Sequence, residues 1–117
     1  MWYVFAVSVL FLSLTACNSS NPRQQDLAAL GLPDAPFVQA EFRNHLETFK
    51  KEGSARGVVL DSSNLTVVFK NLSKSENLLG ACNVDYVLVE IDETNWKAMS
   101  LYTQEQVLFH ELGHCLL

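Results

Sequence analysis

The sequence TQEQVLFHELGHCLL occupies residues 103–117, and the rest of the chain is organised around it. Thr103 and Gln106 have the spacing of a capping box, which marks the start of a helix. Within that helix, apolar side chains recur at helical spacing and form a stripe that can face a core: Leu108, Leu112 and Cys115. The sequence therefore predicts a helix from Thr103 to Leu117 that is anchored along one side.

The same helix carries a pattern suited to a metal ion on another side. His110 and His114 are four residues apart, so in a helix they project from one face, one turn above the other. Two imidazoles at this spacing can share one tetrahedral Zn²⁺, and the intervening Glu111 then stands beside the metal as a general base. The expected cofactor is Zn²⁺.

The run from His110 to His114 resembles the signature of the zincins, the zinc-dependent metallopeptidases named for this motif. About a dozen of the 117 residues carry the resemblance. It implies peptide-bond hydrolysis, with His110 and His114 as metal ligands and Glu111 as the catalytic base. A similar His-Glu-Leu-Gly-His-Cys run occurs in small lipoprotein metallopeptidases of Gram-negative bacteria, where a following tail bears the third ligand.

A catalytic zinc site needs three protein ligands and an open position for water, and this pattern supplies two. In the metzincin branch the second histidine is followed by x-x-Gly-x-x-His, but here Leu117 stands at the glycine position. A glutamate on a following helix, as in thermolysin-like enzymes, is not found either. We therefore expect the third ligand beyond Leu117 and the chain to be a fragment.

Residues 1–16 form an apolar run without a charged side chain, which predicts a signal peptide. The run ends in Leu14-Thr15-Ala16-Cys17, which resembles the lipobox of bacterial lipoproteins and implies lipid attachment at Cys17. The expected location is then the bacterial cell envelope, with the membrane as a partner through the anchor. Because no Lys or Arg precedes the apolar run, a buried helix, a non-lipidated signal and an uncleaved anchor stay open as alternatives.

Residues 17–33 are expected to form a lipidated cysteine and a polar tether, and residues 34–117 an incomplete zincin-like domain. Apolar spacing predicts a helix over residues 37–52, ended by Gly53. Three stretches are then typical of β-strands, at residues 58–60, 65–69 and 84–91. The expected fold is α+β: an N-terminal helix packed on a small mixed sheet, followed by the zinc-binding helix, as in the N-terminal half of a zincin domain.

Two further expectations concern the predicted strand over residues 84–91. In the zincins an edge strand beside the metal pairs with the peptide substrate, and residues 84–91 are our interpretation of that strand. Asp92 and Glu93 follow it and are interpreted as a solvated strand end rather than as a cation site.

The chain has three cysteines, so lipidation of Cys17 would leave Cys82 and Cys115. In an oxidising compartment such a pair tends to form a disulfide, which would tie the metal helix to the sheet. Two buried free thiols are an equally good interpretation. The formal net charge of −5 gives no support to nucleic-acid binding, which favours basic patches.

The sequence thus predicts a membrane-anchored zinc metalloendopeptidase whose partner is a peptide or protein substrate. The first alternative is a non-catalytic envelope lipoprotein, or an inactive remnant of a metallopeptidase. The second is another zinc enzyme with the same motif, such as a peptide deformylase or a SprT-like protease, and the export signal argues against it because those enzymes work inside the cell.

Overall fold

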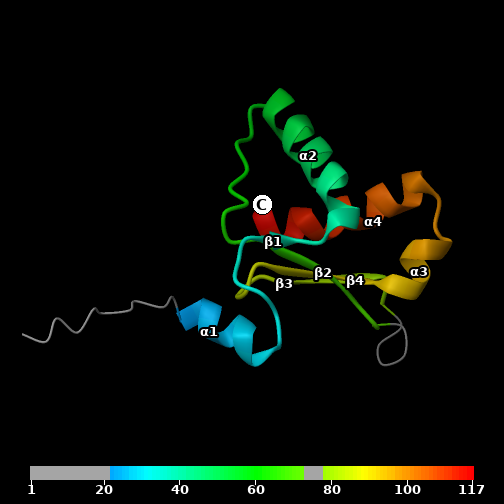
Figure 1. Ribbon diagram of the computed structural model, residues 1–117. Helices are drawn as coiled ribbons and strands as arrows, with labels where there is room; N and C mark the ends of the chain where they lie inside the picture. Colours follow the sequence, from blue (N-terminus) through cyan, green and yellow to red (C-terminus); the bar gives the residue numbers. More distant parts are fainter. Residues whose placement is uncertain (1–21, 73–77) are drawn as a thin grey trace, which may run out of the picture.

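The structure is a computed structural model that describes residues 22–72 and 78–117 (Figure 1). In chain order its elements are α1 (Pro22–Ala29), β1 (Phe37–Val38), α2 (Ala40–Ala55), β2 (Thr66–Lys70), β3 (Gly80–Asn83), β4 (Leu88–Asp92), α3 (Glu93–Ala98) and α4 (Leu101–Leu116). Helices and a mixed sheet share one body, so the predicted α+β class is confirmed. The predicted signal peptide, residues 1–16, and Cys17 lie outside the described residues.

The strands form one sheet in the order β1-β2-β4-β3. β1 pairs with β2 and β2 with β4 in parallel, whereas β3 and β4 form an antiparallel hairpin. Figure 1 shows α2 and α4 together on one face of the sheet, with α1 on the opposite side. β4 therefore lies inside the sheet, and β3 is the edge strand on the side of α4.

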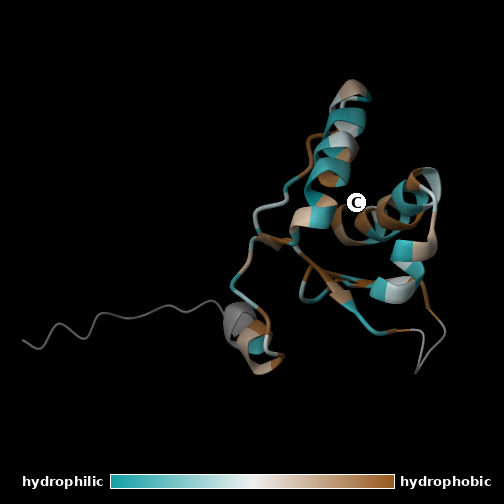
Figure 2. Cartoon of the chain, turned by 45° about the vertical axis from the view of Figure 1, so that its right-hand side comes forward, coloured by the Kyte–Doolittle hydropathy of each residue, from teal (hydrophilic) through white to brown (hydrophobic). Residues whose placement is uncertain are grey.

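The two-residue alternation of the strands separates the two faces of the sheet. Alternate residues of β2 and β4 point toward α2 and α4, where the main core forms, and Figure 2 shows the brown apolar segments gathered there. The fully or nearly buried members of this core are Phe42, Leu46, Leu65, Val67, Val89, Ile91, Trp96, Leu108 and Leu112. The other face mixes apolar and polar side chains: Val68 and Leu88 are buried there, and Lys70 forms an ion pair with Glu90.

Aromatic rings join α2 and α3 to the sheet at one end of this core. The ring of Phe42 lies 4.6 Å from that of Phe69 and 5.0 Å from that of Trp96, centroid to centroid. His45 packs edge-on against Trp96 at 5.5 Å. Tilted and edge-to-face contacts at these distances are the favourable arrangements for aromatic pairs. We call these four residues the aromatic cluster.

Asp92 corrects the interpretation of the strand end. It is fully buried rather than solvated, and it is the N-cap of α3. Its carboxylate accepts hydrogen bonds from the backbone N–H of Leu72 (2.8 Å) and from the backbone N–H (2.9 Å) and side-chain amide (2.8 Å) of Asn95. A buried carboxylate is tolerated because these donors replace the water that it loses. Glu93 is half exposed and pairs with Lys97.

Several predicted element boundaries were wrong. Residues 37 and 38 form β1, so the helix predicted from residue 37 begins at Ala40, and it continues past Gly53 to Ala55. Residues 58–60 form no strand, and the side chain of Val59 is 94% exposed. Within the tether predicted for residues 17–33, the structure places α1, whose Leu27 is fully buried.

Only the second half of the strand predicted over residues 84–91 is a strand in the structure. Residues 84–87 form the turn of the β3–β4 hairpin, in which Val87 adopts a positive φ of 47°, and β4 begins at Leu88. The strand before this turn, β3, was not predicted. Across residues 22–72 and 78–117, none of the helices combines the length and the apolar character needed to cross a bilayer.

Candidate metal centre

The helix that carries the histidines begins earlier than its sequence suggested. Ser100, not Thr103, is the N-cap: its hydroxyl accepts a hydrogen bond from the backbone N–H of Thr103 at 3.2 Å. Leu108 and Leu112 are fully buried, as the apolar stripe predicted, and they fix α4 against the sheet. Once this side is buried, helical geometry places His110 and His114 at exposed positions of α4 and Glu111 at a partly buried one.

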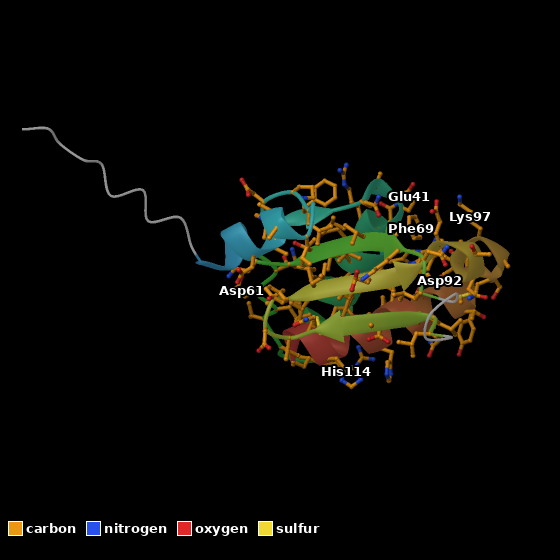
Figure 3. All side chains as sticks on the ribbon, turned by 90° about the horizontal axis from the view of Figure 1, so that it is seen from below. Glu41, Asp61, Phe69, Asp92, Lys97 and His114 are labelled. Atoms are coloured by element: carbon orange, nitrogen blue, oxygen red, sulfur yellow. A yellow bond between two sulfur atoms is a disulfide. The ribbon has the colours of Figure 1, made fainter. Side chains whose placement is uncertain are left out.

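His110 and His114 lie together on the surface of α4. Their Nε2 atoms are 3.1 Å apart, and their rings meet edge to face at 4.6 Å. Two nitrogens that are each about 2.05 Å from a tetrahedral zinc ion lie about 3.3 Å apart. The two imidazoles therefore already have nearly the separation that adjacent ligands of one Zn²⁺ require, and in Figure 3 His114 lies at the rim of the molecule, beyond β3.

Glu111 lies on the side of α4 that faces the edge strand. The register pairs Gly80 with Ile91 and Cys82 with Val89, so the side-chain positions of Gly80 and Cys82 point to the same face of the sheet as the core. A methyl group at position 80 would come within 3.0 Å of both Glu111 Cγ and Ile91 Cδ1. Because Gly80 has no side chain, Glu111 Cγ can pack beside β3 at this position.

One helical turn further on, a covalent bond joins the same two elements. Cys115 in α4 and Cys82 in β3 form a disulfide, with their Cα atoms 5.7 Å apart. Of the two interpretations that the sequence left open, the structure has the bridge rather than the free thiols. We call the contact of α4 with β3, through Glu111, Gly80, Cys82 and Cys115, the α4–β3 seam.

A groove of about 570 Å³ opens at the seam, on the side of the histidines. Its walls come from the start of β3 and from α4, and they consist of Leu78, Leu79, Gly80, Gln106, Val107, His110 and Glu111. Another cavity, of about 390 Å³, lies between α2 and α4, but none of the three motif residues lines it. Only the first of these two cavities is lined by residues of the motif, the carboxylate of Glu111 and the imidazole of His110, beside apolar side chains.

The backbone of β3 is open along this groove. The N–H of Asp92 donates to the carbonyl of Leu79 at 2.9 Å. Because hydrogen-bonded and non-hydrogen-bonded pairs alternate in an antiparallel ladder, the N–H and C=O groups of Gly80 and Cys82 point away from β4, to the free edge. The interpretation of residues 84–91 as the edge strand was wrong, since β4 has β2 on one side and β3 on the other.

The histidine pair has no third protein ligand within the parts of the chain that the structure describes. Among those residues no group of three or more His, Cys, Asp or Glu side chains is placed to hold a metal ion. The third histidine, His45, packs against Trp96 in the aromatic cluster. The structure therefore brings the rings of His110 and His114 together, and His110 and Glu111 line the same groove.

The comparisons with known proteins add no relative. No family model matches the chain, and neither a curated protein nor a solved structure is similar to it. The resemblance to the zincins consequently rests on the motif in α4.

Proposed function

We propose that this chain belongs to a zinc-dependent metalloendopeptidase. The observation that carries the proposal is the pair of imidazole nitrogens 3.1 Å apart, with Glu111 between them in sequence and an open strand edge beside them. His110 and His114 would hold the metal through Nε2, together with a third ligand that the described residues do not supply. The resemblance to the zincin signature and the groove at the α4–β3 seam support this assignment.

Glu111 is the general base of the proposed reaction. When bound, Zn²⁺ lowers the pKa of a water molecule to about 7 and polarises the carbonyl of the scissile peptide bond. The carboxylate of Glu111 takes the proton of the attacking water and passes it to the leaving amine. Its Cγ lies beside Gly80, where a side chain on β3 would displace it.

The edge of β3 is where the peptide substrate would bind. The outward N–H and C=O groups of Gly80 and Cys82 can pair with an extended backbone, as in other cases of strand addition. A peptide bound in this way runs past Glu111 and His110, because both line the groove that begins at β3. This arrangement requires an extended, unstructured segment as substrate.

Export and lipid attachment at Cys17 are part of the same proposal. They rest on the apolar run and on the Leu14-Thr15-Ala16-Cys17 sequence. The disulfide between Cys82 and Cys115 supports an oxidising compartment, since disulfides persist outside the cytosol and are rare inside it.

The test separates metal binding from hydrolysis. Glu111→Gln keeps the shape of the side chain but removes its basicity, so it should retain zinc and lose at least a hundredfold in peptide hydrolysis relative to the unmodified chain. His110→Ala with His114→Ala should lose zinc. Zinc would be quantified by competition with a chromophoric chelator, and hydrolysis by mass spectrometry of a mixed peptide library. Equal hydrolysis by Glu111→Gln would remove Glu111 from the mechanism.

The alternative function is a non-catalytic envelope lipoprotein. The observation in its favour is that the described residues offer no third ligand to the histidine pair. Under this alternative α4 serves packing through Leu108 and Leu112, and the chain should bind no more zinc than the double histidine variant does.

A further inference from the structure

We propose that the cavity between α2 and α4 binds an organic ammonium ion, a ligand that carries one positive charge on an apolar body. The cavity has a volume of about 390 Å³, and pockets that hold small molecules begin at about 300 Å³. We call it the α2–α4 cavity. None of His110, Glu111 and His114 lines it, so the inference goes beyond the proposed function and does not depend on it.

The cavity forms where α2 extends beyond the main core. The buried residues of α2, Phe42 and Leu46, lie in its first half, and residues 48–55 are partly buried or exposed. Figure 1 shows α2 rising away from the sheet toward its C-terminal end. In the loop after α2, Leu60 packs against Gly53, where an added Cβ would lie 3.0 Å from Leu60 Cδ1. This loop and α2 therefore form one side of the cavity, and α4 forms the other.

Two phenylalanine rings form the aromatic part of the cavity wall. The ring of Phe49 on α2 meets that of Phe109 on α4 edge to face, with 5.0 Å between their centroids. Both residues are partly exposed, so a ligand can reach them. The face of a phenyl ring attracts an ammonium group that lies within about 6 Å of the ring centroid. Val58 and Leu60 extend the wall with aliphatic surface, against which an apolar body can pack.

The charged side chains of the α2–α4 cavity leave one negative charge in excess. Arg56 pairs with Glu52 at 2.6 Å, so the charges of these two residues cancel. Glu105 lines the same cavity and is partly buried, and its carboxylate has no ion pair or hydrogen-bond partner among the residues that the structure describes. The helix that carries it, α4, contains no lysine or arginine. A ligand with one positive charge is therefore the electrostatic complement of the cavity.

The same features select against other classes of ligand. A neutral apolar molecule would cover the carboxylate of Glu105 without replacing the water that the carboxylate loses, which opposes binding. An anion would be repelled by that carboxylate. A small ammonium ion without an apolar body would bury little of the surface of Val58, Leu60 and the two phenyl rings, and would lose that part of the binding free energy.

The first experiment compares probes on the unmodified chain and needs no variant to fold. Phenethylamine, which is an ammonium ion at neutral pH, and phenethyl alcohol have nearly the same shape and differ in charge. Each is titrated into isotope-labelled protein, and binding is followed by the NMR shift of the backbone N–H of Gly53, which lines the cavity. We expect phenethylamine to bind at least about fivefold more tightly, since the rings and Glu105 both favour the cation. Ethylamine, which has the charge without the ring, should bind more weakly than phenethylamine.

The second experiment assigns the preference to named side chains. Glu105→Gln should lower the preference for phenethylamine over phenethyl alcohol about threefold, whereas Glu47→Gln, a carboxylate on α2 outside the cavity, should leave it unchanged. Phe109→Leu keeps apolar surface but removes a ring, so it should weaken the binding of phenethylamine. Tyr102→Leu is the control for that change, because it removes an exposed ring of α4 that does not line the cavity.

Three results would overturn the inference. The first is equal binding of phenethylamine and phenethyl alcohol, or binding of neither. The second is an equal effect of Glu105→Gln and Glu47→Gln, which would place the preference outside the cavity. The third is a shift of Gly53 that depends on protein concentration without any probe, which would show that a second copy of the chain fills the cavity. His110→Ala with His114→Ala should bind phenethylamine as the unmodified chain does, so failure of the proposed metal site would leave this inference standing.

Discussion

The aromatic cluster and the α4–β3 seam hold their helices to the same sheet by different means. In the aromatic cluster, three rings around Trp96 join α2, α3 and β2, and the rings of Phe42 and Phe69 contact each other as well as Trp96. In the α4–β3 seam, the disulfide and the contact of Glu111 over Gly80 join α4 to β3, and among the described residues β3 pairs with β4 alone. The aromatic cluster is held by packing between rings, whereas the seam includes a covalent bond.

The two regions have different expected roles: the aromatic cluster stabilises the domain, and the α4–β3 seam lies beside the proposed site. Packing spread over many contacts gives most of the free energy of unfolding, and it tolerates little change in volume. The α4–β3 seam borders a surface groove lined by Gly80, His110 and Glu111, where the proposed peptide substrate would bind. Substitutions in the aromatic cluster should therefore lower the free energy of unfolding, and substitutions at the α4–β3 seam should lower peptide hydrolysis.

The largest loss of stability is expected from Phe42→Ala. The side chain is fully buried and touches both Phe69 and Trp96, so its removal should lower the free energy of unfolding by about 3–5 kcal/mol. Tyr102→Ala is the control, because that ring is 75% exposed and its loss should change stability by less than about 0.5 kcal/mol. Chemical denaturation followed by far-UV circular dichroism measures both. A small loss for Phe42→Ala would contradict the shared packing of the cluster.

An intermediate loss is expected from Asp92→Ala, at the base of the helix that carries Trp96. The backbone N–H groups of Leu72 and Asn95 would lose their acceptor, and α3 would lose its N-cap, at a cost of about 2–3 kcal/mol. Glu93→Ala removes the neighbouring carboxylate, whose exposed ion pair with Lys97 contributes less than about 1 kcal/mol. Thermal unfolding of the two variants should rank them in this order. A similar melting temperature for both would show that the buried carboxylate is dispensable.

Of the substitutions Phe42→Ala, Asp92→Ala and Gly80→Ala, the last is expected to lose the least stability and to lower peptide hydrolysis. The added methyl group must displace Glu111 Cγ or Ile91 Cδ1, which are 3.0 Å away. The strain is partly offset by the reduced entropy of the unfolded chain, so the net cost should stay below about 1 kcal/mol. Displacement of the Glu111 carboxylate should still lower peptide hydrolysis at least tenfold while zinc stays bound.

Gly113→Ala is the matched control for that substitution. A methyl group at Gly113 meets nothing within 4 Å, so it should leave hydrolysis unchanged and raise stability by about 0.5–1 kcal/mol through helix propensity. Both variants would be compared by thermal unfolding, zinc competition and peptide hydrolysis. If Gly80→Ala hydrolyses peptides as the unmodified chain does, contact with β3 does not orient Glu111.

The sequence predicted the elements whose pattern is local and regular. The stripe of Leu108 and Leu112 indicated both the existence of α4 and the side that it buries, and the predicted strand over residues 65–69 corresponds to β2. The spacing of His110 and His114 was enough to bring their nitrogens together, because a helix fixes that distance without help from the fold.

The wrong predictions concern residues whose secondary structure or burial depends on contacts with residues that are distant in the sequence. β3 contains Gly80, Ala81 and Asn83, which have weak strand propensity, and it is a strand because β4 pairs with it. Val84 and Val87 have strong strand propensity and yet form the turn of the hairpin. The carboxylate of Asp92 is buried because Leu72, twenty residues earlier, donates to it. None of these contacts leaves a periodic signal in the chain.

The insertion of β4 between β2 and β3 also constrains the order in which the chain can fold. The ring closed by Cys82 and Cys115 spans 33 residues and contains β4 and α3. In the native arrangement the two sulfurs meet where α4 packs over the hairpin, so docking of α4 favours this pairing over an open chain. Pulse alkylation of the thiols during refolding would therefore follow the docking of α4 on β3 and β4.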